Sequence, residues 1–466
     1  MIGPEERRAV VLVGGPAAPY SRALRIARAL AAEGWAVEIA AVAAAGLPER
    51  EVIAPPAPGS AGAPEPEKGS AGPIELRRYR PSGPWAVLGA TDATAGIGEA
   101  GPTGRTRSGA RGVALTVARP LLALRRWLFW PHTVRGWWST LERDLAPADL
   151  YHACGSLAIG AALEARDRSA GRRGRVIYDA IDDVAESNTT AAMPRFVRRW
   201  IARREAGWAR AADAVVTVND ALGRRLAARW RLDRSPLVVT NMPEPSAIPA
   251  RTADRSEALR AAGGLPPWMR IVLFQGRLGP DLGLDAAADA VLHVPDAALV
   301  LIGFGRGMVA SLARDRDPRF AGRHVTLPAR HPDELLAWTA GADVAIIPLP
   351  PASANQRLST PNKFWEALAV GTPVVVVAGL EVMEQLVRDR DLGAVAASPS
   401  PEDLAAAIET VLARNTTEGP AWRERIAASA AEHHGWPGQA TAYRALVRSV
   451  FDGDGDGAGD RDAADG

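Results

Sequence analysis

The chain has 466 residues, of which 47% are apolar, and this is enough to build two or three packed domains. Its 55 basic and 53 acidic residues nearly balance, so the composition provides no overall attraction to nucleic acid, and we expect no such partner. The single cysteine, Cys154, excludes an internal disulfide framework, fits a reducing cytoplasm and is expected to be a core residue.

The beginning of the chain lacks the pattern of a secretory signal. Residues 1–8 are charged, and the apolar run at 9–13 stops at two glycines. No stretch reaches the roughly 18 consecutive apolar residues that a membrane-spanning helix needs. We therefore expect a cytoplasmic protein that is either soluble or peripheral at the inner face of the membrane.

Apolar runs and helical periodicity alternate along the first half of the chain. Runs typical of buried parallel strands occur at 9–14, 36–41, 149–153, 175–180, 214–218 and 237–240. Helical spacing is found at 20–33, from 157 onward, at 194–211 and at 220–230. Residues 45 to about 110 are rich in Ala, Gly, Pro and Ser, which predicts a largely flexible insertion.

The same alternation continues in the second half. Strands are predicted at 271–275, 298–302, 324–327, 343–348, 373–377 and 393–396, with helices of about 8–14 residues between them. This order predicts an α/β protein with a doubly wound parallel sheet in each half, at 1–245 and 246–425. A C-terminal helix is expected within 426–451, and the Asp/Gly-rich tail at 452–466 is expected to be disordered.

The junction best suited to a ligand is STPNKFWEALAVGTP at 359–373. In open α/β sheets, ligands bind beyond the carboxyl ends of the strands, where helix N-termini present unpaired N–H groups. Thr360 is the expected N-cap, Pro361 suits the first helical position, and Gly371 suits the helix stop.

Lys363 and Glu366 give this helix its chemistry. Only Lys68 and Lys363 are lysines among the 55 basic residues, so a lysine in an ordered helix is unusual for this chain. A cation in the first turn opposes the helix dipole, and a bound diphosphate would remove that conflict. Glu366, one turn later, can accept hydrogen bonds from ribose hydroxyls. An ordinary capped helix with a solvated Lys–Glu pair is an alternative of equal weight.

The run T-P-N-K-x-x-E followed by G-T-P-V, at 360–374, resembles the donor-site helix of the family 4 (group 1) glycosyltransferases, which have the GT-B fold of two facing Rossmann-like domains. The resemblance covers about 9–45 and 145–450. It implies that a glutamate at the position of Glu366 binds the donor ribose and that the arginine of a G-R-L loop contacts the diphosphate. The donor-binding residues implied or expected in this way are Gly15, Gly276, Arg277, Gly303, Phe304, Ser359, Thr360, Asn362, Lys363 and Glu366.

Three positions depart from the family pattern. Leu358 stands where the family has the first glutamate of its E-x(7)-E motif, and Leu282 stands where a lysine usually precedes the glycine. Ile181 stands where a catalytic histidine often follows a strand.

The sequence at that strand end is Tyr178-Asp179-Ala180-Ile181-Asp182-Asp183. Asp182 or Asp183 is therefore the expected catalytic carboxylate, together with the cations Arg277 and Lys363. Acids that decorate a helix N-terminus are an equally weighted alternative. His152, Asp179 and Asp182 are the expected acceptor-side residues, although a core histidine is at least as probable an interpretation of His152.

Two further polar clusters predict no metal site. His433 and His434 lack a third ligand at a suitable spacing, and the acidic run from Asp452 lacks the closing glutamate of a calcium-binding loop. We expect no cofactor.

The segment 119–138 mixes arginine with tryptophan and leucine. An interfacial helix that meets anionic lipid is one interpretation, and it suits a lipid-linked acceptor. A core helix with basic edges is the interpretation we favour.

The resemblance implies transfer of a sugar from a nucleotide diphosphate sugar to a glycan, lipid-linked or small-molecule acceptor, with retention of configuration, in polysaccharide or glycoconjugate synthesis. The alternatives are an inactive binding or scaffold protein with the same fold, which Leu358 and Ile181 would motivate, and a nucleotide-sugar epimerase.

Overall fold

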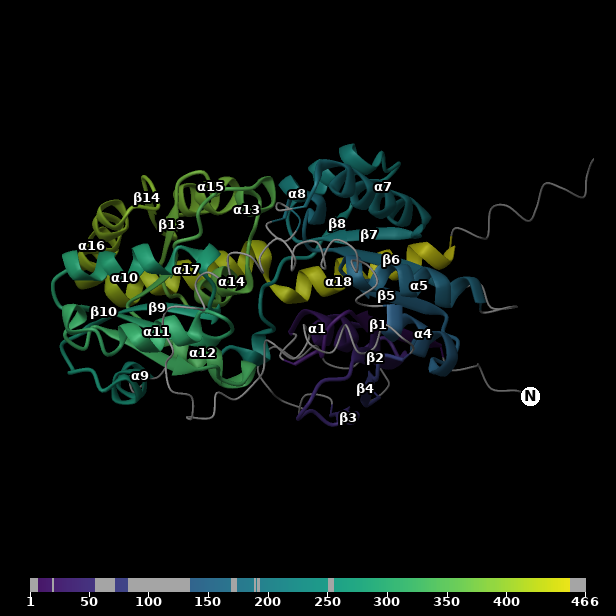
Figure 1. The fold of residues 1–466 in the computed structure, drawn as a ribbon, viewed down its shortest axis with the longest axis horizontal. Helices are drawn as coiled ribbons and strands as arrows, with labels where there is room; N and C mark the ends of the chain where they lie inside the picture. Colours follow the sequence, from purple (N-terminus) through teal and green to yellow (C-terminus); the bar gives the residue numbers. More distant parts are fainter. Residues whose placement is uncertain are drawn as a thin grey trace, which may run out of the picture.

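The computed structural model describes residues 7–18, 21–54, 72–82, 135–168, 174–187, 190, 193–249 and 255–452. These residues form two α/β units that lie next to each other along the long axis of the molecule (Figure 1). Each unit contains one sheet, as the alternating pattern predicts. No helix within these ranges is both long enough and apolar enough to cross a membrane.

The first sheet has the order β3-β4-β2-β1-β5-β6-β7-β8, and its neighbouring strands are parallel except for the pair β3 and β4. Its strands are β1 (Arg8–Val13), β2 (Ala36–Val42), β3 (Arg50–Ile53), β4 (Ile74–Tyr79), β5 (Leu150–Cys154), β6 (Arg175–Ala180), β7 (Ala214–Thr217) and β8 (Leu237–Val238). Its helices include α1 (Ser21–Ala31), α4 (Arg135–Asp144), α5 (Ser156–Arg168), α7 (Arg195–Ala211) and α8 (Asp220–Trp230).

Two of these strands correct the expectation of a largely flexible insertion at 45–110. Strands β3 and β4 lie inside that range, and β4 pairs with β2 in parallel register. Ile74, Leu76 and Tyr79 of β4 are buried, so the strand contributes to the core although its surroundings are rich in Ala, Gly, Pro and Ser.

The second sheet has the order β11-β10-β9-β12-β13-β14, and all its recorded pairs are parallel. Its strands are β9 (Arg270–Arg277), β10 (Ala297–Phe304), β11 (His324–Pro328), β12 (Val344–Ile347), β13 (Val374–Val377) and β14 (Gly393–Ala396). Its helices are α9 (Arg255–Gly263), α10 (Leu284–His293), α11 (Met308–Arg314), α12 (Pro332–Ala340), α13 (Ala354–Arg357), α14 (Asn362–Ala369), α15 (Glu381–Arg390), α16 (Pro401–Thr417) and α17 (Gly419–His434).

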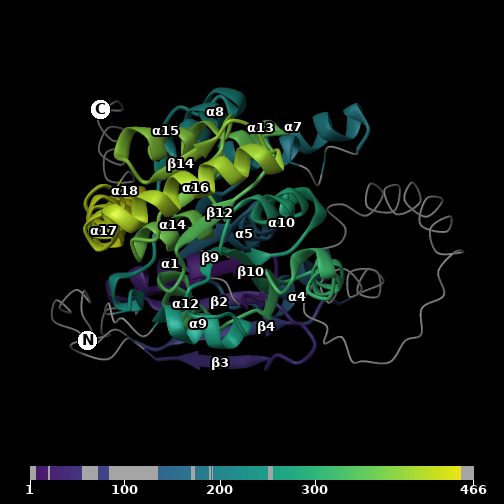
Figure 2. The same ribbon diagram turned by 90° about the vertical axis from the view of Figure 1, so that its left-hand side faces the viewer.

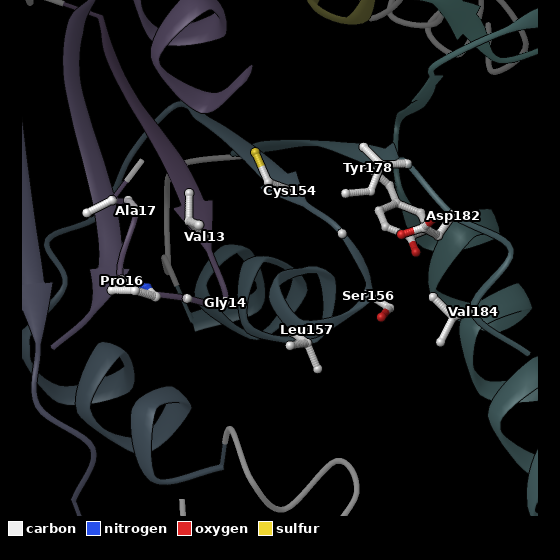
Figure 3. Close-up of a pocket in the computed structure, with 14 residues that line it drawn as sticks. Val13, Gly14, Pro16, Ala17, Cys154, Ser156, Leu157, Tyr178, Asp182 and Val184 are labelled. Carbon is white, nitrogen blue, oxygen red and sulfur yellow. The ribbon is translucent and has the colours of Figure 1, made fainter. Parts of the chain in front are cut away.

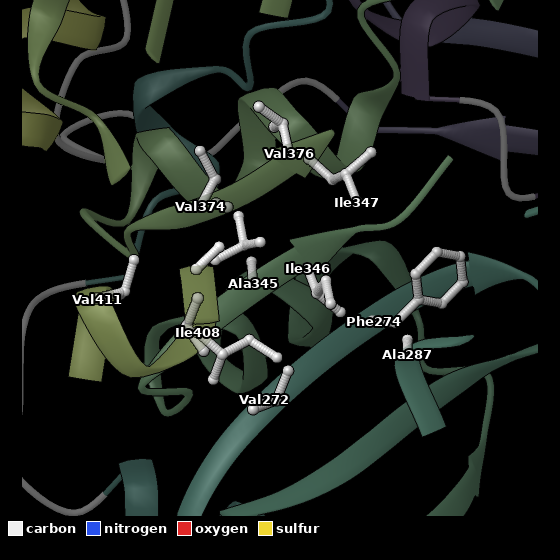
Figure 4. Close-up of a cluster of buried hydrophobic side chains, with 14 of the residues drawn as sticks. Val272, Phe274, Ala287, Ala345, Ile346, Ile347, Val374, Val376, Ile408 and Val411 are labelled. Atoms are coloured by element: carbon white, nitrogen blue, oxygen red, sulfur yellow. The ribbon is translucent and has the colours of Figure 1, made fainter. Parts of the chain in front are cut away.

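The core of the second unit forms where the central strands meet α16 and α14. The four valines of β13 are all fully buried, as expected of a parallel strand that is covered on both faces. Val272, Val374 and Ile408 belong to this core, which Figure 4 shows.

The C-terminal segment forms two helices rather than the one expected within 426–451. Helix α17 packs on α14, and α18 (Trp436–Asp452) packs on α1 of the first unit. In Figure 2 the second unit is in front, and α17 and α18 lie together at one edge. Tyr443 and Val447 of α18 are buried in the same cluster as residues of β1 and α1, so the chain crosses back to its first unit. Residues 453–466 lie outside the described ranges.

The segment at 119–138, for which we favoured a core helix over one that meets lipid, is described only from residue 135 onward, where α4 begins. Trp137 and Trp138 of α4 are buried, and the indole N–H of Trp137 donates to the carbonyl of Ala41 at 3.0 Å. The described end of the segment is therefore part of the core.

Candidate active site between the two sheets

Two asparagines join the carboxyl ends of the two sheets. Asn355 of α13 donates from Nδ2 to Oδ1 of Asp182 at 2.9 Å, and its Oδ1 accepts from the backbone N–H of Asp183 at 2.7 Å. Asn219, which follows β7, donates to the carbonyl of Leu358 at 2.8 Å and to Oγ1 of Thr360 at 3.3 Å. These contacts hold the segment before α14 against the first unit.

Helix α14 begins one residue later than the sequence predicts. Pro361 is its N-cap and makes no side-chain cap, whereas Thr360 is buried and bonded to Asn219. Thr360 is therefore an interdomain contact rather than the predicted cap. Gly371 has a φ of 71°, and a Cβ there would lie 2.3 Å from the carbonyl oxygen of Arg423, so the predicted glycine stop is required. Asn362 is exposed at the first helical position, and Ser359 is partly buried before it.

The ammonium group of Lys363 lies over the ring of Phe274, 3.8 Å from its centroid. A Cβ on Gly276 would lie 3.6 Å from Nζ, so the end of β9 passes close to the lysine. Burial is the main reason that the pKa of Lys363 falls to about 7, and the nearby Arg277 lowers it further, while Glu366 and Asp281 oppose the shift.

Glu366 lies on the same side of α14 and is held by β9. Oε2 of Glu366 accepts from Nε2 of Gln275 at 2.6 Å, and Oε1 of Gln275 accepts from Thr339 at 2.6 Å. Burial raises the pKa of Glu366, although the bond from Gln275 and the charges of Arg25 and Lys363 lower it. One carboxylate oxygen is thus oriented by a chain of hydrogen bonds.

Arg277 and Phe304 end the adjacent strands β9 and β10, where they are register partners. The guanidinium of Arg277 is paired with Asp281 through two hydrogen bonds of 3.0 and 2.8 Å, and its side chain is 53% exposed. Such an exposed pair contributes about 1 kcal/mol or less, so an incoming diphosphate can compete for the arginine. Gly303 is buried, and a Cβ there would lie 2.1 Å from the carbonyl oxygen of Gly276, so this glycine allows the two strands to pack.

A cavity of about 290 Å³ lies opposite, at the carboxyl ends of β1, β5 and β6 (Figure 3). Gly14 and Gly15 line one side of it, and Asp182 lines another. A Cβ on Gly14 would lie 2.5 Å from Cβ of Leu157, whereas a Cβ on Gly15 would meet nothing within 4 Å. Gly14 is therefore needed for packing, and Gly15 faces open space.

Asp182 and Asp183 have different environments. Asp183, the other candidate catalytic carboxylate, is buried and paired with Arg225 at 2.8 Å and with Arg229 at 2.6 Å, and it is not on the described lining of the cavity. Asp182 is exposed at the cavity. The surrounding protein desolvates it and raises its pKa, with a further contribution from Asp183, while the bond from Asn355 lowers the pKa.

His152 and Asp179 are both fully buried, which corrects their expected place on the acceptor side. Arg22 donates to both oxygens of Asp179, at 2.7 and 2.8 Å, and Nε2 of His152 lies 3.4 Å from Oδ2. The hydroxyl of Tyr443 lies 3.0 Å from Nδ1 of His152. Burial would raise the pKa of Asp179, but the charge of Arg22 and the bonds from His152 and Arg22 hold it well below its usual range.

These two residues and Cys154 come close enough to hold a metal ion, but their chemistry does not fit one. Both oxygens of Asp179 are already used by Arg22. Burial also raises the pKa of the Cys154 thiol well above its usual value, which opposes the thiolate that a metal needs.

Solved structures share this arrangement over almost the whole chain. Sucrose-phosphate synthase from Thermosynechococcus elongatus has a TM-score of 0.60 at 18% identity, covering 96% of this chain and 100% of that one. HepE from Anabaena in complex with UDP and glucose has a TM-score of 0.59 at 14% identity, covering 95% and 100%. The two-unit α/β fold with parallel sheets is that of the GT-B enzymes. This chain has the GT-B fold.

Sequence comparisons agree with the GT-B fold for its second domain. Residues 269–414 match the family model of the group 1 glycosyl transferases. The D-inositol 3-phosphate glycosyltransferase of Mycobacterium marinum is 30% identical over 247 residues, 52% of this chain and 51% of that protein. Its namesake from Mycolicibacterium gilvum is 35% identical over 170 residues, 34% of this chain and 36% of that protein. The matched part thus spans about half the length of these curated relatives, or less.

Three residues of the candidate site were missed from the sequence. Gln275 orients Glu366, while Asn219 and Asn355 join the domains. Asn219 precedes α8 and caps it by accepting from Leu222, so its position before a helix was a usable signal. Asn355 and Gln275 carry no comparable signal, because their partners are distant in the sequence.

Proposed function

We propose that this protein is a glycosyltransferase that moves a sugar from a nucleotide diphosphate sugar to a hydroxyl group of an acceptor held by the N-terminal domain. One observation carries the proposal. Lys363 and Glu366 share one helix beside the end of β9, and the short helix α13 before it holds Asp182 of the opposite domain through Asn355. Ligands of open α/β sheets bind at such strand ends.

The second domain, 246–425, would bind the donor. The free N–H groups at the start of α14 and the charge of Lys363 suit a diphosphate, and Arg277 can join them once it leaves Asp281. Glu366 would accept hydrogen bonds from the ribose, with Gln275 fixing its orientation. Asn362, Ser359 and Phe304 border this site, and Gly15 lets the backbone of the first domain approach the donor.

The acceptor hydroxyl would attack the anomeric carbon, forming the new glycosidic C–O bond. The bond from that carbon to the diphosphate oxygen breaks, and its electron pair leaves with the nucleoside diphosphate. The hydroxyl proton passes to the carboxylate of Asp182. Lys363 and Arg277 neutralise the charge that develops on the leaving group. We propose retention of configuration, which the resemblance to family 4 supports and which requires the hydroxyl to attack from the same face of the sugar that the diphosphate leaves.

Calorimetry with UDP, GDP and dTDP tests the donor half of the proposal. We expect one of them to bind and Lys363→Ala to weaken that binding at least tenfold, because the variant removes a charge-assisted contact worth about 1.5–3 kcal/mol. The matched control is Arg388→Ala, which removes an exposed cation of the same domain that pairs only locally with Glu384. If none of the three nucleotides binds, the proposal is refuted.

The alternative is a protein of the same fold that binds a nucleotide sugar without turning it over. It is favoured by the apolar residues at 181 and 358, both of which pack against the core of the first domain. Incubation of the protein with labelled nucleotide sugars and membrane extract distinguishes an active transferase from an inactive binding protein. Bound donor with neither transfer nor hydrolysis would favour the inactive protein.

A further inference from the structure

We propose that the acceptor is an alcohol or phenol with an apolar body, which fills the cavity of the N-terminal domain and presents its hydroxyl group to Asp182. The inference rests on the proposed function and adds the chemical class of the second substrate. It differs from what the names of the curated relatives say, because those proteins are named for a phosphorylated inositol.

The lining of the cavity is mostly apolar. Around its mouth and walls the described residues contribute the side chains of Val13, Pro16, Ala17, Leu157, Ile181 and Val184. Figure 3 shows Leu157 at the base of the space and Val184 beside Asp182. Contact with an apolar body removes water from these groups, and each buried methylene contributes about 0.8 kcal/mol.

Few polar side chains are available to a buried sugar. Tyr178 lines the cavity, but its hydroxyl donates to Oε1 of Glu205 at 2.8 Å and is fully buried. Asp182 and Ser156 are the remaining polar side chains with oxygen atoms on the described lining. A monosaccharide carries a hydroxyl on nearly every ring carbon, and each one buried without a partner costs about 1–3 kcal/mol. These two side chains can satisfy one or two hydroxyl groups, but not a full set.

The cavity offers still fewer favourable contacts to a phosphate group. Among the described residues that line the cavity there is no arginine, lysine or histidine. The N-terminus of α5 contributes a modest positive potential, but the carboxylate of Asp182 opposes it. A phosphorylated acceptor would therefore meet an unpaired acid without a compensating cation.

One of the three departures from the family pattern, Ile181, fits the same chemistry. Ile181 and Leu358 come from different domains, and both pack against one apolar cluster around β1, β5 and β6. Of these two, Ile181 is on the described lining of the cavity, so the position where the resemblance implies a histidine adds apolar surface on the acceptor side. The volume of about 290 Å³ is at the low end of ligand pockets, which suits a body of one ring.

A matched set of six-membered rings tests the inference on the full chain. The acceptors are cyclohexanol and phenol on one side, and myo-inositol and myo-inositol 3-phosphate on the other, each with the labelled sugars of the nucleotide found by calorimetry as donors. We expect the apolar alcohols to be preferred at least tenfold in kcat/KM. Equal or better transfer to inositol or its phosphate overturns the inference, and so does the absence of transfer to either apolar alcohol by a protein that binds its donor.

Two variants tie the preference to the cavity. Ile181→Asn and Val184→Thr place polar atoms in the lining, and we expect each to lower kcat/KM for cyclohexanol at least tenfold while the Kd for the nucleotide stays unchanged. Val52→Thr, at an exposed valine of β3 that does not line the cavity, is the control and should change both values less than threefold. An unchanged nucleotide Kd also shows that the variants fold. If the wild-type protein binds none of the nucleotides, the proposed function itself is refuted.

Discussion

The ammonium group of Lys363 has three neighbours that decide its charge. The face of Phe274 takes it partly out of water, Arg277 repels it, and Glu366 attracts it. Burial outweighs the attraction, so the pKa falls to about 7. Between pH 7 and about 10.4 the unfolded chain holds this proton and the folded chain does not, so the group makes the fold more stable as pH rises through that window.

Diphosphate binding should reverse that preference and draw a proton onto Lys363. We expect nucleotide affinity to fall as pH rises through about 7, and binding at pH 7.5 to take up a proton from the buffer. Calorimetry in buffers of different ionisation enthalpy measures this uptake. Lys363→Arg, whose charge does not titrate, is the control that corrects for protonation of the nucleotide. Equal proton uptake by the variant would contradict the assignment.

Gly14 and Gly15 are adjacent, yet they should respond differently to one added methyl group. Gly14→Ala would place its Cβ against Leu157, so we expect a loss of about 1–3 kcal/mol in the free energy of unfolding. Gly15→Ala has open space and should fold normally, but it should lower turnover because it narrows the approach to the donor. Urea unfolding and donor turnover are the two measurements. The reverse pattern would contradict the assigned roles.

At the scale of elements, the very short helix α13 positions Asn355 against the first domain. It follows β12, and it begins with a capping box in which Ser353 and Gln356 bond reciprocally. This closure fixes four residues that would gain little from helix propensity alone. Asn355 is thereby presented to the loop after β6, so that a residue of the donor domain orients the carboxylate proposed as the base.

Asn355→Ala should change the pH profile as well as the rate. Loss of the bond to Asp182 removes an influence that lowers the pKa of that carboxyl, so the acidic limb of kcat/KM should move to higher pH. Asn415→Ala is the control, since Asn415 donates to the carbonyl of Asp343 within the second domain. A lower rate with an unshifted profile would mean that Asn355 only holds the domains together.

At the scale of the whole molecule, α18 connects the donor domain to the core of the first domain. Its Tyr443 reaches His152, which lies beside the buried pair of Arg22 and Asp179. The pair joins α1 to the end of β6, immediately behind the cavity. Residues that the sequence suggested for the acceptor therefore support the wall of the site rather than face it.

The variants Asp179→Asn and Asp182→Asn should distinguish a residue that stabilises the fold from one that takes part in the reaction. The first leaves Arg22 buried without its counter-charge, and we expect a loss of about 3–5 kcal/mol in unfolding free energy. The second changes an exposed carboxylate, so stability should change by less than about 0.5 kcal/mol while turnover falls strongly. Denaturant unfolding and turnover measure both. An Asp179→Asn protein that is stable but inactive would indicate that Asp179 takes part in the reaction directly.

Much of the fold could be predicted from local sequence patterns, whereas the contacts between the residues of the site could not. The apolar runs of β6 and β13 marked buried parallel strands, because such strands are covered on both faces. Strand β4 was missed because its six residues, IELRRY, stand within a long stretch rich in Ala, Gly, Pro and Ser, which dominated the prediction for the whole range. The burial of Asp179 depends on Arg22, which lies 157 residues away, and no periodicity reports a partner at that separation.

The near absence of lysine from this chain makes its chemistry selective. An ordinary lysine holds on the order of a thousandfold less free amine at pH 7 than a group with a pKa of about 7. The sequence contains one other lysine, Lys68. A limiting amount of an amine-directed acylating reagent at neutral pH should therefore modify Lys363 before Lys68, and the nucleotide that occupies the cleft should slow that labelling. Peptide mass mapping then reports occupancy of the donor site in the unmutated protein.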